Sequence, residues 1–260
     1  MRILQPIRGL ILLMAGLSLA AGASGDISIF RRYQALDARI VEARQALAER
    51  RFPDALHLLE PCLQKIPDHF EAHFLLAQMA YEHRDFAGAL AHVETSERTL
   101  AALDQQYHDQ LAELKAQEAA EAQALKVSLD ELTARGGDPS GCSHHLFMTK
   151  ESALRYLEGK KGQLFHQDTP FAVPAAYHLL HGNCLYRLGR PAEAIARYRL
   201  AIQADPRQPD AWNNLLALLL ETGDRPGARA ELARAEAARV ALRPALQRAV
   251  LSGPVTAGPR

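Results

Sequence analysis

The chain has 260 residues, of which 48% are hydrophobic and only 6% aromatic, and its 30 basic residues balance 30 acidic ones. Alanine, leucine, glutamate, arginine and glutamine recur throughout while β-branched residues are sparse, which excludes a strand-rich fold. No basic stripe with interleaved aromatic residues occurs, so a nucleic-acid-binding protein is excluded as well. Three cysteines are too few for a disulfide-stapled scaffold, and the composition therefore predicts an all-α protein held by a hydrophobic core.

Residues 1–23 have the features of an export signal. Arg2 and Arg8 form a short positive region, residues 10–21 are almost entirely apolar, and small residues precede a predicted cut after Ala23. This apolar run is shorter than the roughly 20 residues that a membrane-spanning helix needs. We therefore expect a cleaved signal peptide and a periplasmic protein. An uncleaved membrane anchor is the alternative, and contact with the membrane is expected only in that case.

Two pairs of alanines indicate an internal repeat. Ala55 and Ala89 lie in amphipathic runs 34 positions apart, and Ala194 and Ala228 do so at the same spacing. A period of this length is typical of a repeat unit made of two helices. Because a single helix pair cannot bury its apolar face, we expect neighbouring units to stack, with small residues where two helices cross closely.

Several further positions resemble the tetratricopeptide-repeat family. Its pattern places Trp, Leu-Gly and Tyr in the first helix of a unit and Ala, Phe, Ala and Pro around the second. The last unit matches at Trp212, Leu215, Leu219, Ala228, Leu232 and Ala235, and the unit before it at Gly182, Leu185, Ala194, Tyr198, Ala201 and Pro206. The resemblance implies an all-α solenoid of stacked helical hairpins, with N-terminal units at 27–98 and C-terminal units at 173–242.

Residues 99–135 interrupt the repeats and contain no Gly or Pro. Leucines and a tyrosine recur there at helical spacing along one side. We expect one long helix that starts near Ala87 and continues to the glycines at 136–137. Two interpretations remain open: the helix rests on neighbouring repeats, or it projects as a coiled-coil arm through which two copies self-associate.

Two other segments fall outside the repeat pattern. Residues 136–172 are predicted to be a loop-rich insertion with one short helix, which begins after Thr149 and stops at Gly159. A loop-rich insertion of this length within a repeat array is more often functional than idle. Residues 243–260 are predicted to be a tail.

The stretch HLLHGNC places His178, His181 and Cys184 at three-residue spacing. Aligned on the family pattern, both histidines face a partner helix, and Gly182 stands where two helices approach closely. We expect two partly buried imidazole rings that form hydrogen bonds with backbone or hydroxyl groups.

The insertion adds further metal-ligating side chains to this region. Together with the helix, Cys142, His144 and His145 would form a His/Cys cluster at 142–184 suited to zinc or copper, so the alternative is a metal- or haem-handling protein. A Cys142–Cys184 disulfide would exclude that site, and Cys142 beside the two histidines is also a candidate thiol nucleophile. No C-x-x-C-H sequence or recognised catalytic motif is present. We therefore expect a protein that is not an enzyme and binds no metal or other cofactor.

In the tetratricopeptide-repeat family, the first helices of the units line an inner groove that binds protein partners. The resemblance implies a partner-binding set from three units: Phe74, Gln78, Tyr81, Leu179, Asn183, Tyr186, Arg187, Asn213, Asn214 and Ala217. The side-chain amides of Asn183 and Asn214 both donate and accept hydrogen bonds, so they can hold an extended peptide backbone regardless of its sequence. We expect a non-catalytic envelope adaptor that mediates protein–protein interaction or complex assembly, holds a protein or peptide in this groove, and binds no nucleic acid.

Overall fold

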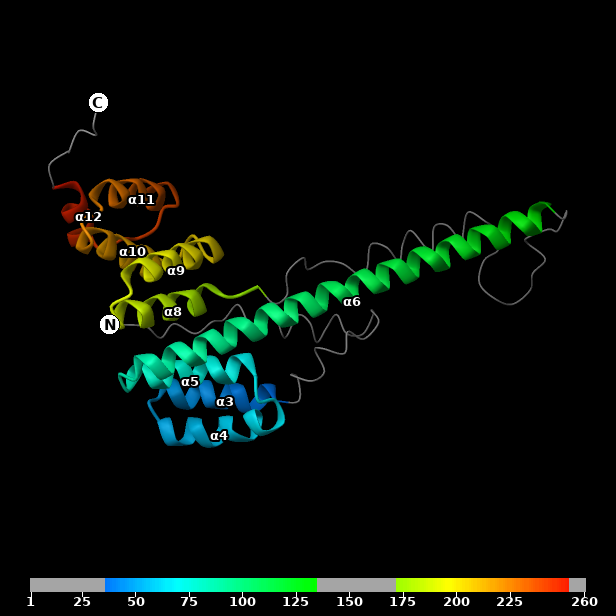
Figure 1. Cartoon of the computed structure of the whole chain (residues 1–260), viewed down its shortest axis with the longest axis horizontal. Helices are drawn as coiled ribbons and strands as arrows, with labels where there is room; N and C mark the ends of the chain where they lie inside the picture. Colours follow the sequence, from blue (N-terminus) through cyan, green and yellow to red (C-terminus); the bar gives the residue numbers. More distant parts are fainter. Residues whose placement is uncertain (1–35, 135–171, 253–260) are drawn as a thin grey trace, which may run out of the picture. The chain divides into compact units, whose positions relative to one another are not determined.

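The computed structural model describes residues 36–134 and 172–252, and these residues form helices joined by short turns, with no strand among them (Figure 1). The helices are α3 (Asp37–Ala48), α4 (Phe52–Lys65), α5 (Phe70–Glu82), α6 (Phe86–Ala134), α8 (Ala175–Arg187), α9 (Pro191–Ala204), α10 (Pro209–Glu221), α11 (Arg225–Ala237) and α12 (Pro244–Leu251). The all-α prediction is therefore confirmed. The predicted signal peptide at 1–23 and nearly all of the insertion at 136–172 lie outside the described residues.

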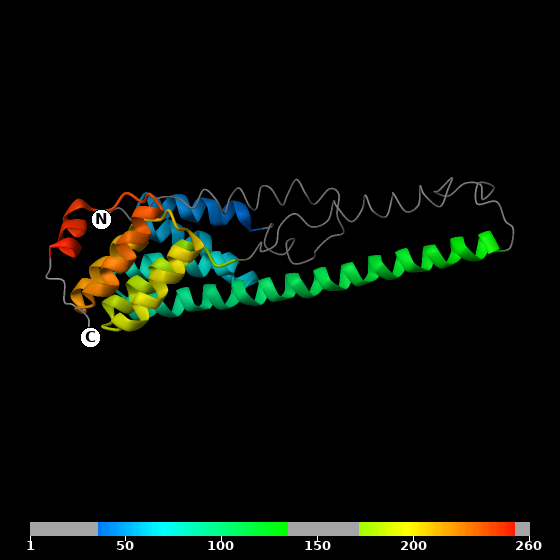
Figure 2. The same ribbon diagram turned by 90° about the horizontal axis from the view of Figure 1, so that it is seen from above.

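The chain divides into two compact units. The described part of the first comprises residues 36–101 and 172–252, and that of the second comprises residues 102–134 of α6. Both views show α6 as one uninterrupted helix, as expected (Figure 2). In the second unit, Leu103 and Tyr107 are buried. None of the described helices combines the length and the hydrophobicity needed to cross a membrane. Self-association through 99–135 stays a prediction.

The turns of the first unit repeat with the same period as the alanines. Helices α3, α5, α8 and α10 are each followed by a residue in the left-handed region: Arg50 (φ 59°), Arg84 (φ 65°), Gly189 (φ 75°) and Gly223 (φ 80°). The first two are 34 positions apart, and so are the last two. A left-handed residue at this point bends the chain back toward the helix end, where the Arg50 N–H donates to the Leu47 carbonyl at 3.0 Å. Each hairpin is thus closed by the same local geometry.

The four alanines that indicated the repeat lie in the core. Ala89, Ala194 and Ala228 are completely buried, and Ala55 is 1% exposed. Each lies in the first half of the second helix of a hairpin, where a larger side chain would push the two helices apart. The prediction of small residues at close helix crossings is confirmed.

A pair of stacked aromatic rings joins the N-terminal hairpins to the C-terminal ones. The rings of Phe74 on α5 and Tyr177 on α8 have centroids 3.7 Å apart and are nearly parallel, with an angle of 4° between them. Both residues are buried. The repeats therefore continue across the long interruption in sequence, because α8 takes the place next to α5 that a following repeat would occupy.

The prediction that residues 243–260 form a tail is wrong for residues 244–251. Residues Pro244–Leu251 form helix α12, which contacts α10 and α11 and fully buries Val250. Pro244 stands at the first helical position, where a missing backbone N–H costs nothing. The helix has only eight residues, so its short apolar face gives a weak periodic signal in sequence.

Candidate functional site

A pocket of about 270 Å³ lies among the helices of the C-terminal hairpins and α5. We call it the groove pocket. Its lining residues are Tyr81, Leu179, Asn183, Tyr186, Arg187, Tyr198, Asp210, Asn214, Ala217, Leu218, Glu221 and Arg243. Seven of the ten sequence-predicted residues are among them. The pocket is thus formed mainly by the first helices α5, α8 and α10, and Tyr198 of the second helix α9 and Arg243 complete its lining.

Two asparagine amides meet in the wall of this pocket. The Asn183 Oδ1 atom accepts hydrogen bonds from the Tyr198 hydroxyl at 3.0 Å and from Asn214 Nδ2 at 2.9 Å. Asn183 is 7% exposed, so its carbonyl is fixed by these two donors. Within the described residues, no partner takes the Asn183 Nδ2 donor or the Asn214 Oδ1 acceptor. The Asn183 Nδ2 and Asn214 Oδ1 atoms therefore remain for a ligand.

Two further polar side chains of the pocket, Tyr186 and Arg187, are positioned by a neighbouring acidic and a neighbouring aromatic side chain. The Tyr186 hydroxyl donates to Glu221 Oε2 at 2.9 Å, and this hydrogen bond raises the pKa of Tyr186. The Arg187 guanidinium lies over the Phe86 ring, 4.8 Å from its centroid, and is exposed. A cation held on a ring face keeps its N–H groups at the ring edge, where they can bind an acceptor.

Three of the predicted residues do not line the groove pocket. Phe74 is buried in the stack with Tyr177. Asn213 is buried, donates to the Pro209 carbonyl at 2.8 Å and accepts from the Arg243 N–H at 3.0 Å. It therefore holds the segment that leads into α12. Gln78 lines a second, smaller hollow.

The sequence interpretation missed Tyr198, Leu218, Asp210, Glu221 and Arg243. Helical spacing from Asn214 was an available signal for two of them, because residues 210, 214, 217 and 221 lie on one face of α10. Tyr198 was assigned only to packing, although its hydroxyl also orients Asn183. Arg243 had no such signal, since it precedes a helix that was not expected.

The two histidines of HLLHGNC bind a carboxylate on α6. The Nδ1 atoms of His178 and His181 lie 3.0 and 2.9 Å from the two Glu97 oxygens, and Arg197 Nη1 lies 2.9 Å from Oε2. Burial raises the pKa of Glu97, but the hydrogen bonds from both histidines and the charges of His181 and Arg197 outweigh it and lower the pKa to about 2. Because an ionised carboxylate only accepts, both rings carry their proton on Nδ1.

This arrangement corrects the expected partners of the histidines. Backbone or hydroxyl groups were expected, and a buried carboxylate takes that place. Cys184 is a buried free thiol whose pKa is raised to about 12 by burial. Cys62 is likewise buried and free, as in a packing position. Within the described ranges, no group of three or more His, Cys, Asp and Glu side chains is arranged to hold a metal ion.

The remaining members of the proposed metal cluster, disulfide and thiol site are not among the described residues. Cys142, His144 and His145 belong to the insertion, outside the described residues. The described members of this cluster already have other contacts. His178 and His181 bind Glu97, and the Cys184 thiol is buried. The two histidines of α8 that the proposed metal site would use are therefore hydrogen-bonded to Glu97 instead.

Family models match both parts of the repeat region. Two family models, each described as tetratricopeptide repeat, match residues 40–106 and 185–250, which together make up about half of the chain. Among solved structures, the chain is similar to a thermophilic TPR protein of Thermus thermophilus. That match has 20% sequence identity and a TM-score of 0.34, and covers 83% of this chain and 99% of the other. No curated protein gives a significant match.

Proposed function

Because this chain belongs to the tetratricopeptide-repeat family, we propose that it is a non-catalytic adaptor that holds an extended segment of a protein partner in the groove pocket. Tetratricopeptide repeats generally bind protein partners. The observation that carries the proposal is the pair of amides in the pocket wall, where Asn214 Nδ2 donates to Asn183 Oδ1 at 2.9 Å.

The chemistry of this pair suits a peptide backbone. An extended peptide presents N–H and C=O groups in alternation along its edge. The Asn214 carbonyl would accept from one such N–H, and the Asn183 amide would donate to a neighbouring C=O. Since Tyr198 fixes the Asn183 carbonyl, little side-chain entropy is lost when a peptide binds. Such recognition is independent of the peptide's side chains.

The groove pocket also has charged groups for secondary contacts. Arg187 and Arg243 contribute guanidinium groups, while Asp210 and Glu221 contribute carboxylates. The lining is therefore mixed in charge. Binding through it would rest on backbone hydrogen bonds and on apolar contact with Leu179, Leu218 and the tyrosine rings more than on one strong charge pair.

We test this proposal with a library of random linear peptides displayed on phage and selected on the immobilised full chain. Peptides that bind are then measured by isothermal titration calorimetry. Asn214→Ala should weaken binding about tenfold, because a half-buried donor and acceptor are lost. Gln64→Ala, an exposed amide on α4, is the matched control and should bind as the parent does. Selection of no peptide, or equal affinity of parent and Asn214→Ala, would contradict the proposal.

The setting of this adaptor is proposed from the sequence. Residues 1–23 would direct export to the periplasm, and cleavage after Ala23 would release the repeats there. The intact mass of protein isolated from the periplasmic fraction of its own cells tests this step. A mass that starts at Ser24 supports it. Recovery of the complete chain from the membrane fraction would instead favour the uncleaved anchor.

A further inference from the structure

Two histidines join α5 to α6. His73 lies near the start of α5, and His92 lies in the second turn of α6. Their Nδ1 atoms are 3.0 Å apart, and both side chains are half-buried. A contact this short between two ring nitrogens is a hydrogen bond, in which one ring donates a proton and the other accepts it. We call these two side chains the histidine pair.

A backbone carbonyl decides which ring of the histidine pair donates. His73 Nε2 lies 2.8 Å from the carbonyl oxygen of Pro67. Because a carbonyl oxygen only accepts, the neutral His73 ring carries its proton on Nε2 and keeps a lone pair on Nδ1. His92 therefore donates through its Nδ1–H group. Both nitrogens of His73 are engaged in this arrangement, so that ring has no position for a second proton.

Protonation of both rings breaks this hydrogen bond. A first added proton settles on Nε2 of His92 and leaves the bond in place, whereas a second must settle on Nδ1 of His73. There it meets the Nδ1–H group and the positive charge of His92, and two such groups titrate as a unit. Burial, followed by the charge of His73, lowers the pKa of His92 from 6.5. The stabilisation by the neutral pair is therefore present above pH 6.5 and is lost as the pH falls below it.

The charged groups around the histidine pair do not compensate a double protonation. Asp85, in the turn before α6, raises the pKa of His92, but burial and His73 outweigh it, and its carboxylate already accepts from a backbone N–H of α6. At the start of α5, burial and in lesser part the charge of His73 lower the pKa of His69 to about 4, while Asp68 acts in the opposite direction. Three imidazole rings thus influence one another, and acid charges them together.

Other contacts between α5 and α6 do not titrate in this range. The Ser96 hydroxyl donates to the Phe70 carbonyl at 2.8 Å. At the opposite end of the hairpin, the rings of Tyr81 and Phe86 meet edge to face, with centroids 5.3 Å apart. Acid should therefore loosen the start of α5 without separating the two helices.

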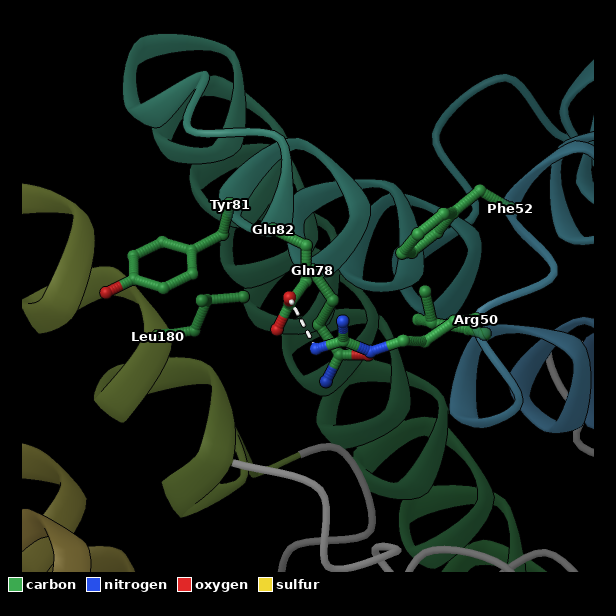
Figure 3. A pocket seen from close by; sticks show the side chains of 7 residues that line it. Arg50, Phe52, Gln78, Tyr81, Glu82 and Leu180 are labelled. Carbon is green, nitrogen blue, oxygen red and sulfur yellow. Dashed lines mark hydrogen bonds and ion pairs between the residues drawn. The ribbon is translucent and has the colours of Figure 1, made fainter. Parts of the chain in front are cut away.

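The start of α5 is also where the helix meets α8. Phe74 follows His73 in sequence and stacks on Tyr177 of α8. Further along α5, Figure 3 shows the Tyr81 side chain beside Leu180 of α8, and Tyr81 also lines the groove pocket. A movement of α5 relative to α6 therefore reaches the wall of the groove pocket.

We propose that the histidine pair is an acid-sensitive latch, which holds α5 against α6 at neutral pH and, when both rings are protonated, loosens α5 and weakens binding in the groove pocket. The release of α5 follows from the hydrogen bond alone, whereas the effect on binding rests on the proposed function. Glu97 stays ionised above pH 4.5, so α6 remains attached to α8 while α5 loosens.

Hydrogen exchange of the full chain at pH 7 and pH 5, followed by mass spectrometry, tests the release. Rates are corrected for the pH dependence of unprotected amides, and α10 is the internal reference. Amides of α5 should exchange about tenfold faster at pH 5 relative to those of α10, because one hydrogen bond is lost and two like charges are opposed. An equal response of α5 and α10 would overturn the proposal.

Three variants assign the response to the histidine pair. His92→Gln keeps an N–H donor for His73 but does not titrate, so it should remove most of the response of α5. His57→Gln changes an exposed histidine of α4 and should respond as the parent does. His69→Asn removes the other titrating ring at the start of α5 and should keep the response. A response that survives in His92→Gln and disappears in His69→Asn would contradict the proposal.

A second measurement needs no variant. In ¹⁵N-labelled protein, the two Nδ1 nuclei should show a scalar coupling through the hydrogen bond at pH 7, and acid should remove it. Absence of the coupling at pH 7 would overturn the proposal. So would a pH response of α5 that disappears when EDTA is added, because a metal ion would then lie between the two rings.

Binding measurements separate this proposal from the proposed function. A peptide selected on the groove pocket should bind about tenfold more weakly at pH 5 than at pH 7, and this difference should shrink in His92→Gln. A loosened α5 with unchanged affinity would contradict the effect on binding while the peptide still supports the adaptor. If no peptide is selected, the adaptor function is contradicted, and exchange and coupling still decide whether the latch exists.

Discussion

The Nδ1 atom of His181 lies 2.9 Å from Oε2 of Glu97, although the two residues are 84 positions apart in the sequence. The same carboxylate binds His178 and Arg197. Glu97 belongs to α6, which precedes the insertion, whereas its three partners lie on α8 and α9, which follow it. One buried side chain therefore links the N-terminal hairpins to the C-terminal ones, and α8 carries four of the residues that line the groove pocket.

We expect Glu97→Ala to lower the free energy of unfolding by about 3 kcal/mol. The change leaves three buried or half-buried donors without their acceptor, and removal of one member of a buried ion cluster has a cost of this size. Chemical denaturation followed by circular dichroism measures the difference. Glu94→Ala is the matched control, since Glu94 lies one turn earlier, is 47% exposed and stands 3.9 Å from His181 Nε2. Its loss should stay below about 0.5 kcal/mol. Equal losses would show that the Glu97 contacts contribute little.

Acid should destabilise the fold in two successive pH ranges. Burial lowers the pKa of His69 from 6.5 to about 4, so its neutral form is favoured in the folded protein and stability is lost as the pH falls from 6.5 to 4. Glu97 has its pKa lowered from 4.5 to about 2, so its stabilisation is present above pH 4.5 and is lost between 4.5 and 2. Across the first range, protonation of His69 should lower the free energy of unfolding by up to about 3 kcal/mol.

His69→Asn separates these two ranges. His69 caps α5, where its Nδ1 atom accepts from the Ala72 N–H at 3.4 Å, and protonation would remove that acceptor. Asparagine is a good cap but does not titrate. Denaturation curves measured from pH 7 to pH 4 should therefore be flatter for His69→Asn than for the parent. A parent protein whose stability does not change between pH 6.5 and 4 would contradict the expected burial of neutral His69.

The sequence alone was enough to predict structural features that recur in every repeat unit. The positions of Ala55, Ala89, Ala194 and Ala228 predicted four close helix crossings, because a helix pair imposes the same packing need in each unit. Seven of the residues that the family resemblance implied for partner binding likewise line the groove pocket, and their role in binding stays a prediction. Periodicity transfers such positions from one repeat to the next without knowledge of the tertiary structure.

Contacts that do not repeat could not be predicted in this way. Glu97 lies in α6, and no local sequence pattern indicates that its partners stand 81 to 100 positions away. Asn213 and Asn214 are adjacent, yet only Asn214 faces the groove pocket. Asn213 instead holds the backbone of Arg243, which leads into a helix with too few residues to be expected.

Gly182→Ala should destabilise the protein by about 2 kcal/mol. A Cβ at this position would lie 2.6 and 2.7 Å from two ring carbons of Tyr198, which is 2% exposed and cannot move freely. In an unobstructed helix the same change stabilises by about 1 kcal/mol, so the sign of the effect is diagnostic. Thermal denaturation measures it. A stabilised variant would show that α8 and α9 are not in close contact here. Displacement of Tyr198 should also weaken peptide binding, since its hydroxyl orients Asn183.

Removal of one hydroxyl group should have opposite effects at two buried tyrosines. Tyr177 is completely buried, and its hydroxyl has no hydrogen-bond partner among the described residues, so Tyr177→Phe should stabilise the protein by about 1 kcal/mol while keeping the stack with Phe74. Tyr198 is also buried, but its hydroxyl donates to Asn183, and Tyr198→Phe should cost about 1 kcal/mol. Urea denaturation of both variants beside the parent checks the difference. Because the chemical change is identical, a loss at both positions would mean that the Tyr177 hydroxyl is satisfied, for example by a buried water between α5 and α8.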